Sequence, residues 1–338
     1  MVIMKKNYSV FTVFASAAFL LLSCSHLENS GQSARQRDGE KTSSIKVLNW
    51  NLQTFFDANF DGTEYSQFKN SSAGWSKEKY EERLERLAEV VKSSDPDVLV
   101  VQELENSGQL YDIFNRLCSN FNLRKNYSYG CFAKEKGSSI GTAVLSRYPL
   151  SSPAVHSLDI RTEPEKMPSM RPLLKVFVTV KEKPLLLLVN HWKSKSGGEE
   201  KTEIWRNYQE NVLAFCFASA AQKGQCAIAC GDFNRDISEF KKMNEENANI
   251  ELRGQNPAFV YSPWFDEQNE LYEPGSYFYK NEWGRIDHFF AGKGVHLSHF
   301  AVENDGEWAR EDGSPFKYVV RYGSGYSDHF PISCVVSW

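Results

Sequence analysis

The chain has 338 residues, of which 41% are hydrophobic and 14% aromatic, so it is long enough to bury a substantial core. Its formal net charge is −4, which argues against the strongly basic surface of a protein that binds DNA tightly. An enzyme whose local cations grip a few phosphates remains compatible with this charge.

The first 23 residues have the pattern of an export signal. Lys5 and Lys6 precede the apolar segment 10–22, which is too short to span a membrane comfortably as a helix. The segment ends in "LLSC" (21–24), which resembles a bacterial lipobox. This resemblance implies cleavage before Cys24 and a lipid on its sulfur; the alternative is a plain secretory signal with a chance cysteine. In both cases residues 1–23 lie outside the fold.

Residues 24–44 are polar and predict a flexible tether. From residue 45 onward apolar strands alternate with helical patterns, and no second linker interrupts them. We therefore expect one α/β domain over 45–338. The helices are predicted at 77–93 and 200–222. The strands are predicted at 45–52, 95–104, 141–150, 171–180, 183–192, 226–234, 286–292 and 332–338.

Early in this domain, "DANFDG" (57–62) begins like a calcium-binding loop. Asp57, Asn59 and Asp61 have the right spacing, but Phe68 stands where an EF-hand needs its bidentate glutamate. The segment is therefore not an EF-hand. A partial Ca²⁺ site and a plain acidic turn both remain open.

The six cysteines beyond Cys24 permit disulfides in an exported protein. Cys226 and Cys230 share one predicted strand, which places their Cα atoms about 13 Å apart, too far for a bridge. A bridge between Cys118 and Cys131 is conceivable.

Polar side chains end several of the predicted strands. If the strand ends converge, these side chains gather in one cleft, and their carboxylate and amide oxygens suit Mg²⁺ or Mn²⁺. Hydrolysis of a phosphate ester needs such an ion, a base for water and a group at the leaving oxygen. The polar residues are Asn51, Glu103, Asn190, His191, Asp232, Asn234, Asp287, Asp328 and His329.

The segments that carry these residues resemble the endonuclease/exonuclease/phosphatase superfamily, which has the deoxyribonuclease-I-like fold. They are "NWNLQ" (49–53), "VQELEN" (101–106), "NHWKSKSGG" (190–198), "GDFN" (231–234), "RIDHFF" (285–290) and "SDHFP" (327–331). Several also resemble its secreted bacterial nuclease branch. The resemblance implies a four-layer α/β sandwich of two mixed β-sheets flanked by helices.

The resemblance also implies a metal site and a water-activating group. Glu103 would be the principal metal ligand with Asn51 beside it, and Asp328 would complete the metal and water network. Asp232 and Asn234 would orient the attacking water and the phosphate.

Two histidines receive roles in the same way. His329 would contact the phosphate or act as a base, held by Asp287, and a carboxylate in that position fixes the imidazole tautomer. His191 would stabilise or protonate the leaving group. His288 departs from the many relatives that carry tyrosine there. Because it points to the strand face opposite Asp287, we expect a structural role for it.

Further cations and aromatic residues leave alternatives open. Lys193 and Lys195 predict a phosphate-binding loop, with a solvated basic loop as the alternative. Three arginines, Arg147, Arg171 and Arg285, are expected to be surface or scaffold charges, with additional phosphate contacts as the alternative. Five aromatic residues are candidates to stack on bases, touch a membrane or fill the core. They are Trp264, Phe265, Tyr277, Tyr279 and Trp283.

The sequence thus predicts a phosphodiesterase that uses Mg²⁺ or Mn²⁺, with a possible additional Ca²⁺. It is expected to be a monomeric nuclease for DNA, RNA or both, exported and anchored in a bacterial cell envelope. The alternatives are a sphingomyelinase-like lipid or inositol phosphohydrolase and a non-catalytic binding lipoprotein. For an active enzyme, His329→Ala is expected to lower turnover by orders of magnitude with little loss of stability.

Overall fold

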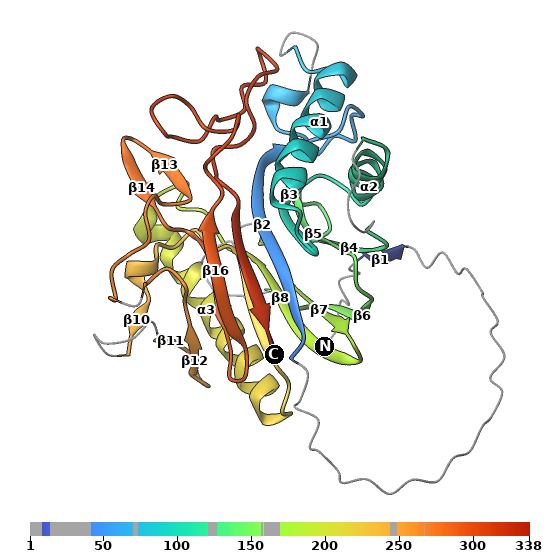
Figure 1. Ribbon diagram of the computed structural model, residues 1–338. Coiled ribbons are helices and arrows are strands. Elements are labelled where there is room, and N and C mark those ends of the chain that lie inside the picture. The colour runs from blue at the N-terminus through green and yellow to red at the C-terminus, as the bar shows by residue number, and fades with distance from the viewer. Residues whose placement is uncertain are drawn as a thin grey trace, which may run out of the picture.

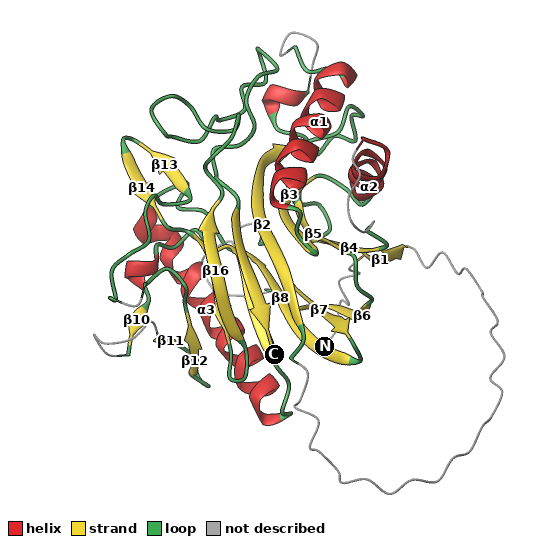
Figure 2. Cartoon of the chain, in the orientation of Figure 1, coloured by secondary structure: helices red, strands yellow, loops and turns green. Residues whose placement is uncertain are grey.

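Two large mixed β-sheets lie face to face, and helices cover their outer surfaces (Figure 1). The computed structural model describes residues 9–13, 42–69, 74–120, 127–156, 158, 170–243, 249–266 and 268–338. The predicted four-layer α/β sandwich is confirmed, with helices on both outer sides of the paired sheets (Figure 2).

The first sheet has seven strands in the order β1–β4–β5–β3–β2–β17–β16. Its central strands β2 and β3 run parallel, and every other neighbouring pair in this described sheet is antiparallel. Helix α1 (Lys77–Ser94) connects the parallel pair, and α2 (Gly108–Asn120) follows β3. The strands are β1 (Ser9–Val13), β2 (Ser44–Phe55), β3 (Val98–Leu104), β4 (Tyr129–Lys134), β5 (Gly141–Ser146), β16 (His296–Val302) and β17 (Ile332–Ser337).

The second sheet has eight strands in the order β10–β11–β12–β15–β9–β8–β7–β6. It repeats the plan of the first, because β8 and β9 are its parallel pair and helix α3 (Glu199–Gln222) connects them. The strands are β6 (Leu150–His156), β7 (Leu173–Val180), β8 (Lys183–His191), β9 (Ala227–Asp232), β10 (Lys241–Lys242), β11 (Asn249–Leu252), β12 (Ala258–Tyr261) and β15 (Asp287–Ala291). A separate hairpin joins β13 (Tyr277–Tyr279) and β14 (Glu282–Gly284), and short 3₁₀ turns cover Ser66–Phe68 and Ile237–Glu239.

Helix α1 shows why these segments adopt their structures. Ser76 caps its N-terminus by accepting a hydrogen bond from the backbone N–H of Lys79, and apolar residues spaced three and four apart face the sheet. The helix ends at Asp95, whose φ of 45° places it in the left-handed region. The predicted helix at 77–93 is therefore confirmed within one residue, as is the helix at 200–222.

The central strands are apolar along their length because both of their faces are covered. Val98 to Val101 of β3 and Leu185 to Val189 of β8 are buried, between a helix layer on one side and the opposite sheet on the other. Polar side chains begin only where these strands end. The core thus fixes the strands whose ends carry the candidate site.

The N-terminal predictions fall mostly outside the described residues. Cys24 and most of the predicted signal and tether lie there. Ser9–Val13, within the predicted signal, pairs antiparallel with β4 at the edge of the first sheet. Cleavage before Cys24 would remove this strand, and the domain boundaries stay a prediction. No helix in the described part of the chain is both long and apolar enough to cross a membrane.

The six cysteines in the described part of the chain are unpaired. Cys118 and Cys131 are both free thiols, so the bridge considered between them does not form in this structure. Cys226 and Cys230 are likewise free, as expected from their spacing along one strand. Disulfides therefore do not contribute to the stability of the described part of the fold.

Candidate active site

The candidate site lies where the two parallel strand pairs end. Asn51 and Glu103 lie at the carboxyl ends of β2 and β3, while His191 and Asp232 are register partners at the ends of β8 and β9. Asp287 begins the antiparallel strand β15 directly opposite Asp232. A helix connects the two strands of each parallel pair, so both strands run in the same direction and end at the same edge of their sheet. The predicted convergence of polar strand ends is therefore present.

Asn51 links the two sheets at this edge. Its Nδ2 donates to Asp232 Oδ2 at 2.9 Å and to Glu103 Oε1 at 3.4 Å, while its Oδ1 accepts from the backbone N–H of Gln53 at 3.0 Å. The expected metal ligand thus uses its amide group to hold two carboxylates in place.

A local irregularity of the backbone aims Glu103 at the site. Glu103 has a φ of 71°, and the register of β3 shifts at this residue against both neighbouring strands. The backbone N–H of Thr54 donates to Glu103 Oε2. Arg83, buried on α1, donates to the carbonyls of Leu52, Gln53 and Thr54. Arg83 therefore fixes the turn that orients Glu103.

Asp232 and Asn234 form a second rigid unit. Asp232 Oδ1 accepts from the backbone N–H of Asn234 at 2.8 Å, and Asn234 Nδ2 donates to Asp232 Oδ2 at 3.1 Å. Burial raises the pKa of Asp232, and the negative charge of Asp287 adds to this, against the opposing effect of His329. A buried carboxylate with a raised pKa is suited to accept a proton from water.

His329 and Asp287 form the predicted pair. His329 Nδ1 donates to Asp287 Oδ2 at 2.8 Å, and the Ser276 hydroxyl donates to the same oxygen at 2.7 Å. Burial lowers the pKa of His329, but the charge and hydrogen bond of Asp287, with the charge of Asp232, outweigh it and raise this pKa to about 10. His329 is therefore protonated at neutral pH, and it suits contact with a phosphate better than the alternative role of base.

His191 has the opposite character. Its Nε2 lies 3.7 Å from both Glu103 Oε1 and Asp232 Oδ2. Burial holds its pKa well below 6.5, and the charges of Arg171, His329 and Lys193 lower it further. The ring is thus neutral and offers a hydrogen bond, so the predicted role of stabilising a leaving oxygen fits better than that of donating a proton.

The two predicted phosphate-binding lysines differ. Burial and the charges of Arg171 and Arg206 lower the pKa of Lys193, so cations are concentrated beside His191. Lys195 instead forms ion pairs with Glu199 and, at 2.8 Å, with Glu239. Its charge is already partnered, which leaves Lys193 as the stronger phosphate-binding candidate.

Asp328 lies at the margin of the site. Its Oδ2 is 3.4 Å from Lys317 Nζ, and its charge contributes to raising the pKa of His329. Among the described residues, no hydrogen bond or ion pair joins Asp328 to Glu103 or Asp232. Its metal-binding role stays a prediction.

The sequence assigned Arg171 and Tyr277 no definite role at the site, and it did not single out Arg83. Arg171, expected to be a surface or scaffold charge, acts electrostatically on His191, Lys193 and Tyr65. Tyr277 packs its ring 4.7 Å from that of His329. Sequence signals for the two arginines are weak, since an arginine on a helix or before a strand is usually exposed.

The donor set fits a hard divalent cation. Glu103 Oε1 and Asp232 Oδ2 approach the same Asn51 amide, and Asp287 Oδ1 is buried without a hydrogen-bond partner among the described residues. Oxygen donors of this kind suit Mg²⁺ or Mn²⁺ rather than zinc. The residues present are therefore compatible with the ion that the resemblance implies.

His288 has the structural environment expected for it. It is buried among the rings of Phe233, Phe240 and Phe290, and its Nε2 donates to the carbonyl of Arg235 at 2.8 Å. It faces away from the reacting groups, as the alternation of a strand requires.

The five aromatic candidates have different environments. Trp264 is in the core, and Trp283 stacks on Phe330. Tyr279, at the tip of the β13–β14 hairpin, is 57% exposed and stacks on Tyr277. Phe265 is partly buried, with Lys242 over its ring. In this set, half-buried Tyr277 packs on His329, and exposed Tyr279 stacks on Tyr277.

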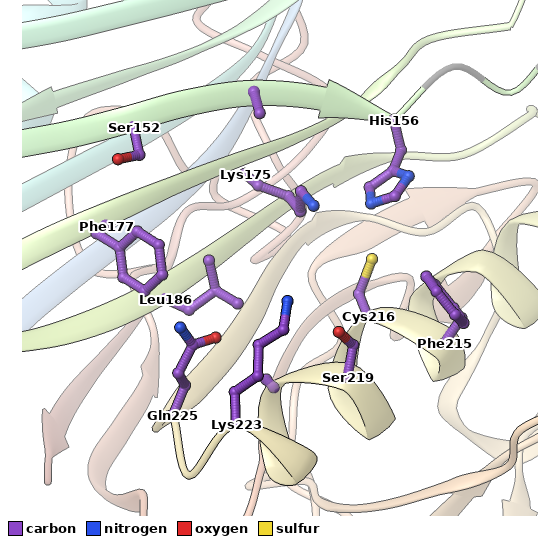
Figure 3. A pocket seen from close by; sticks show the side chains of 12 residues that line it. Ser152, His156, Lys175, Phe177, Leu186, Phe215, Cys216, Ser219, Lys223 and Gln225 are labelled. Carbon is purple, nitrogen blue, oxygen red and sulfur yellow. The ribbon is translucent and has the colours of Figure 1, made fainter.

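A cavity of about 350 Å³ lies elsewhere, between α3 and the strands β6 to β8 (Figure 3). Lys175, Lys223 and His156 lie around it, together with Cys216 and Phe215. It contains none of the candidate catalytic residues, so the strand-end cluster remains the candidate site.

Comparison with solved structures shows the same fold in several proteins. An endonuclease/exonuclease/phosphatase family protein from Bacteroides thetaiotaomicron has a TM-score of 0.54 at 17% identity, covering 88% of this chain and 99% of its own. TDP2 of D. rerio, complexed with single-strand DNA product, has a TM-score of 0.53 at 19% identity, with 87% and 99% covered. The mannosyl-6-phosphatase Bt3783 of B. thetaiotaomicron has a TM-score of 0.51 at 16% identity, with 87% and 100% covered.

No curated protein matches the chain in sequence. The family model described as "Endonuclease/Exonuclease/phosphatase family" matches residues 48–329, a span that contains the strand-end cluster described above. Members of this family hydrolyse phosphate esters and use divalent metals. The chain therefore belongs to the endonuclease/exonuclease/phosphatase family and is a hydrolase of phosphate ester bonds.

Proposed function

We propose that the protein is a nuclease that hydrolyses phosphodiester bonds of DNA, RNA or both at the surface of a bacterial cell. The observation that carries the proposal is the meeting of Glu103, Asp232 and the Asp287–His329 pair at one edge, with Arg171 and Lys193 nearby. Carboxylates that hold an ion, beside cations that hold phosphate, are the groups that phosphodiester hydrolysis needs.

The metal is proposed to be Mg²⁺ or Mn²⁺. Glu103 would hold it, with Asn51 and Asp328 as further candidate ligands, and when bound it supplies charge neutralisation at the phosphate. The protein's own residues supply the remaining functions.

Four side chains act on the substrate or the attacking water in this proposal. Protonated His329, fixed by Asp287, binds a phosphate oxygen. Asp232, whose pKa burial raises, accepts the proton of the attacking water, which Asn234 helps to orient. Neutral His191 donates a hydrogen bond to the leaving oxygen.

Two features support a nucleic acid as the substrate. Tyr277 and Tyr279 stack with ring centroids 6.2 Å apart and lead away from His329, so they offer aromatic faces for unpaired bases. The fold neighbour TDP2 of D. rerio was solved with a single-strand DNA product. The same exposed Tyr279 favours the alternative, a sphingomyelinase-like lipid phosphohydrolase, because a membrane also accepts exposed aromatic side chains.

The location and assembly belong to the same proposal. A lipid on Cys24 would anchor a monomeric enzyme in the cell envelope, with residues 25–44 as the tether. Substrate would then be nucleic acid outside the cytoplasm.

The substrate assay tests the proposal. The full-length protein, held in mild detergent, is incubated with plasmid DNA, RNA, sphingomyelin and inositol phosphates, each with Mg²⁺ or with EDTA. We expect hydrolysis of at least one nucleic acid that EDTA abolishes. Hydrolysis of the lipid or the inositol phosphates while both nucleic acids stay intact would overturn it, and no hydrolysis of any substrate would favour a binding protein.

A further inference from the structure

A second acidic cluster lies close to the candidate active site but is formed by other residues. Asp61 and Glu64 come from the loop after β2, and Glu105 follows β3. One ligand atom from each of the three lies within 4.8 Å of the others. The cluster includes part of the "DANFDG" segment that the proposed catalytic function does not use.

Two carboxylates of this cluster are buried. Glu64 is 3% exposed and Glu105 is 1% exposed. Glu105 Oε2 accepts from the backbone N–H of Asp57 at 2.8 Å, but Glu105 Oε1 is buried without a hydrogen-bond partner in the described part of the chain. A buried carboxylate oxygen without a partner is costly for a fold, so it points to a ligand.

The negative charges around Glu105 increase the free-energy cost of burying its carboxylate. The carboxylates of Asp57, Asp61 and Glu64 place further negative charge around the buried carboxylate of Glu105. Lys134 acts on Asp61, at the exposed side of the cluster. An ordinary acidic turn would expose all of its carboxylates to water, whereas here Asp61 is exposed but Glu64 and Glu105 are buried.

Local hydrogen bonds hold the loop in the shape that gathers the carboxylates. The backbone N–H groups of Asp61 and Gly62 both donate to Glu64, the latter at 2.9 Å. Asn106 Nδ2 donates to Asp57 Oδ2 at 2.9 Å. The cluster is therefore built into the loop rather than formed by chance approach of mobile side chains.

We propose that Asp61, Glu64 and Glu105 bind a calcium ion that is separate from the catalytic metal. Ca²⁺ takes six to eight oxygen ligands in flexible geometry, whereas Mg²⁺ is smaller and keeps several of its waters. Two buried carboxylates leave little room for such a water shell, which favours Ca²⁺. The ligands come from two separate segments, which explains why the loop lacks the EF-hand glutamate at position 68.

The bound ion would stabilise the backbone beside the active site without being part of that site. Glu105 lies two residues after Glu103, and the loop that carries Asp61 and Glu64 also carries Tyr65, on which the charge of Arg171 acts. The rings of Tyr65 and Phe68 pack on Phe56 at 5.3 and 4.7 Å. Calcium would thus tie the loop at 56–69 to the end of β3.

The test measures binding and thermal stability, so it does not depend on the proposed nuclease activity. Full-length protein freed of metal in mild detergent is titrated with CaCl₂ by calorimetry, and its Tm is measured with and without Ca²⁺. We expect one Ca²⁺ per chain and a rise in Tm. Glu64→Gln and Glu105→Gln should weaken the Ca²⁺ affinity at least about tenfold, since the charge of the ligands sets the affinity of such sites.

Glu105→Gln should weaken Ca²⁺ binding but should also stabilise the protein when no Ca²⁺ is present. Without Ca²⁺ this variant should have a higher Tm than the wild type, because its amide cannot repel the neighbouring carboxylates of Asp61 and Glu64. Glu103→Gln at the catalytic site and the exposed Glu82→Gln serve as controls that should keep the wild-type response to Ca²⁺.

Several outcomes would overturn the calcium site. They are a wild type that binds no Ca²⁺ at millimolar concentration, Ca²⁺ binding that Glu64→Gln and Glu105→Gln leave unchanged, and loss of binding in Glu103→Gln. Displacement of Ca²⁺ by an equal concentration of Mg²⁺ would overturn the choice of ion.

Discussion

At the scale of single residues, the burial of His329 and Asp287 changes the stability expected for the variant His329→Ala. His329 is 7% exposed and Asp287 is 1% exposed, and the two are joined by a hydrogen bond of 2.8 Å. Removal of the imidazole would leave the carboxylate buried with fewer partners. The sequence alone, which does not reveal this burial, predicted little loss of stability for His329→Ala.

We now expect His329→Ala to reduce both activity and stability. Turnover should fall by at least about a hundredfold, the scale of losing a positioned charged donor at a reacting phosphate. The free energy of unfolding should fall by about 3 kcal/mol, the cost of breaking a buried pair. Steady-state kinetics and urea unfolding measure the two effects.

The double variant His329→Ala, Asp287→Asn provides the control. It should recover part of the lost stability without recovering turnover, because it removes the unpaired charge but not the need for the imidazole. Full turnover in either variant would contradict a catalytic role for His329.

His288 should make stability depend on pH. Burial lowers its pKa from 6.5 to about 4, so the unfolded chain binds a proton at a higher pH than the folded protein does. The stabilising contribution is present above pH 6.5 and is lost as the pH falls towards 4, by about 3 kcal/mol at most. Urea unfolding of the wild type and of His288→Phe at pH 7 and pH 5 measures it.

The variant should lose less stability than the wild type over this interval. Exposed His299→Phe is the matched control and should follow the wild type. Equal losses in the wild type and in His288→Phe would show that other groups account for the acid sensitivity.

At the scale of the elements, the close contact between β8 and β9 determines the geometry of the site. A Cβ atom added to Gly231 would lie 2.0 Å from the carbonyl oxygen of Asn190. Only glycine permits this approach, and it aligns His191 with Asp232 at the strand ends. Gly231 therefore helps to position His191 and Asp232.

Gly231→Ala is expected to lower activity strongly and the free energy of unfolding by several kcal/mol, because β8 and β9 must separate. Gly137→Ala is a matched control, since Gly137 also has a positive φ, of 80°, but nothing within 4 Å of the added Cβ. It should cost about 1 kcal/mol and leave turnover unchanged. Similar effects of both substitutions would mean that backbone strain, and not contact, matters at Gly231. Circular dichroism unfolding curves and the substrate assay make the comparison.

The sequence predicts strands best where they are buried and apolar. The parallel strands β2, β3, β8 and β9 were all expected, together with the polar residues at their ends. Edge strands such as β6 and β10 were not, because their exposed side chains lack an apolar pattern. Helix α2 was missed although it packs against α1.

Residues that act by long-range contact were harder to predict. Arg83 is buried beneath the turn at 52–54, with its guanidinium 3.9 Å from the ring centroid of Tyr318, 235 positions later in the chain. Nothing local marks such a residue, because the contact exists only after both segments have folded. Glu105 is similar, since its contact with Asp57 reaches a loop 48 positions earlier, with helix α1 and strand β3 between them.

At the scale of the whole molecule, the two sheets make matching contributions. Each supplies one parallel pair joined by a helix, and each pair ends at the shared site, so Asn51 of one half bonds Asp232 of the other. Although the chain has a net charge of −4, Arg171 and Lys193 lie together near His191 at this edge. Local cations of this kind attract a polyanion without a basic surface overall.

The predicted lipid anchor on Cys24 is also tested at the scale of the whole molecule. In a bacterial host, the wild type should incorporate radioactive palmitate and sediment with membranes, whereas Cys24→Ser should incorporate none and should fail to be processed at that residue. The lipid is remote in sequence from the strand ends that carry the site. The kcat/KM for a soluble nucleic acid should therefore change less than twofold once the domain is released by proteolysis within 25–41.

The same experiment decides what strand β1 contributes. Processing before Cys24 removes Ser9–Val13 from the edge of the first sheet, while the six strands from β4 to β16 keep their pairing. An edge strand contacts one neighbour only, so the processed protein should unfold within about 1 kcal/mol of the unprocessed Cys24→Ser chain. A much less stable processed form, or palmitate labelling that persists in Cys24→Ser, would mean that the N-terminal segment belongs to the fold and that the anchor lies elsewhere.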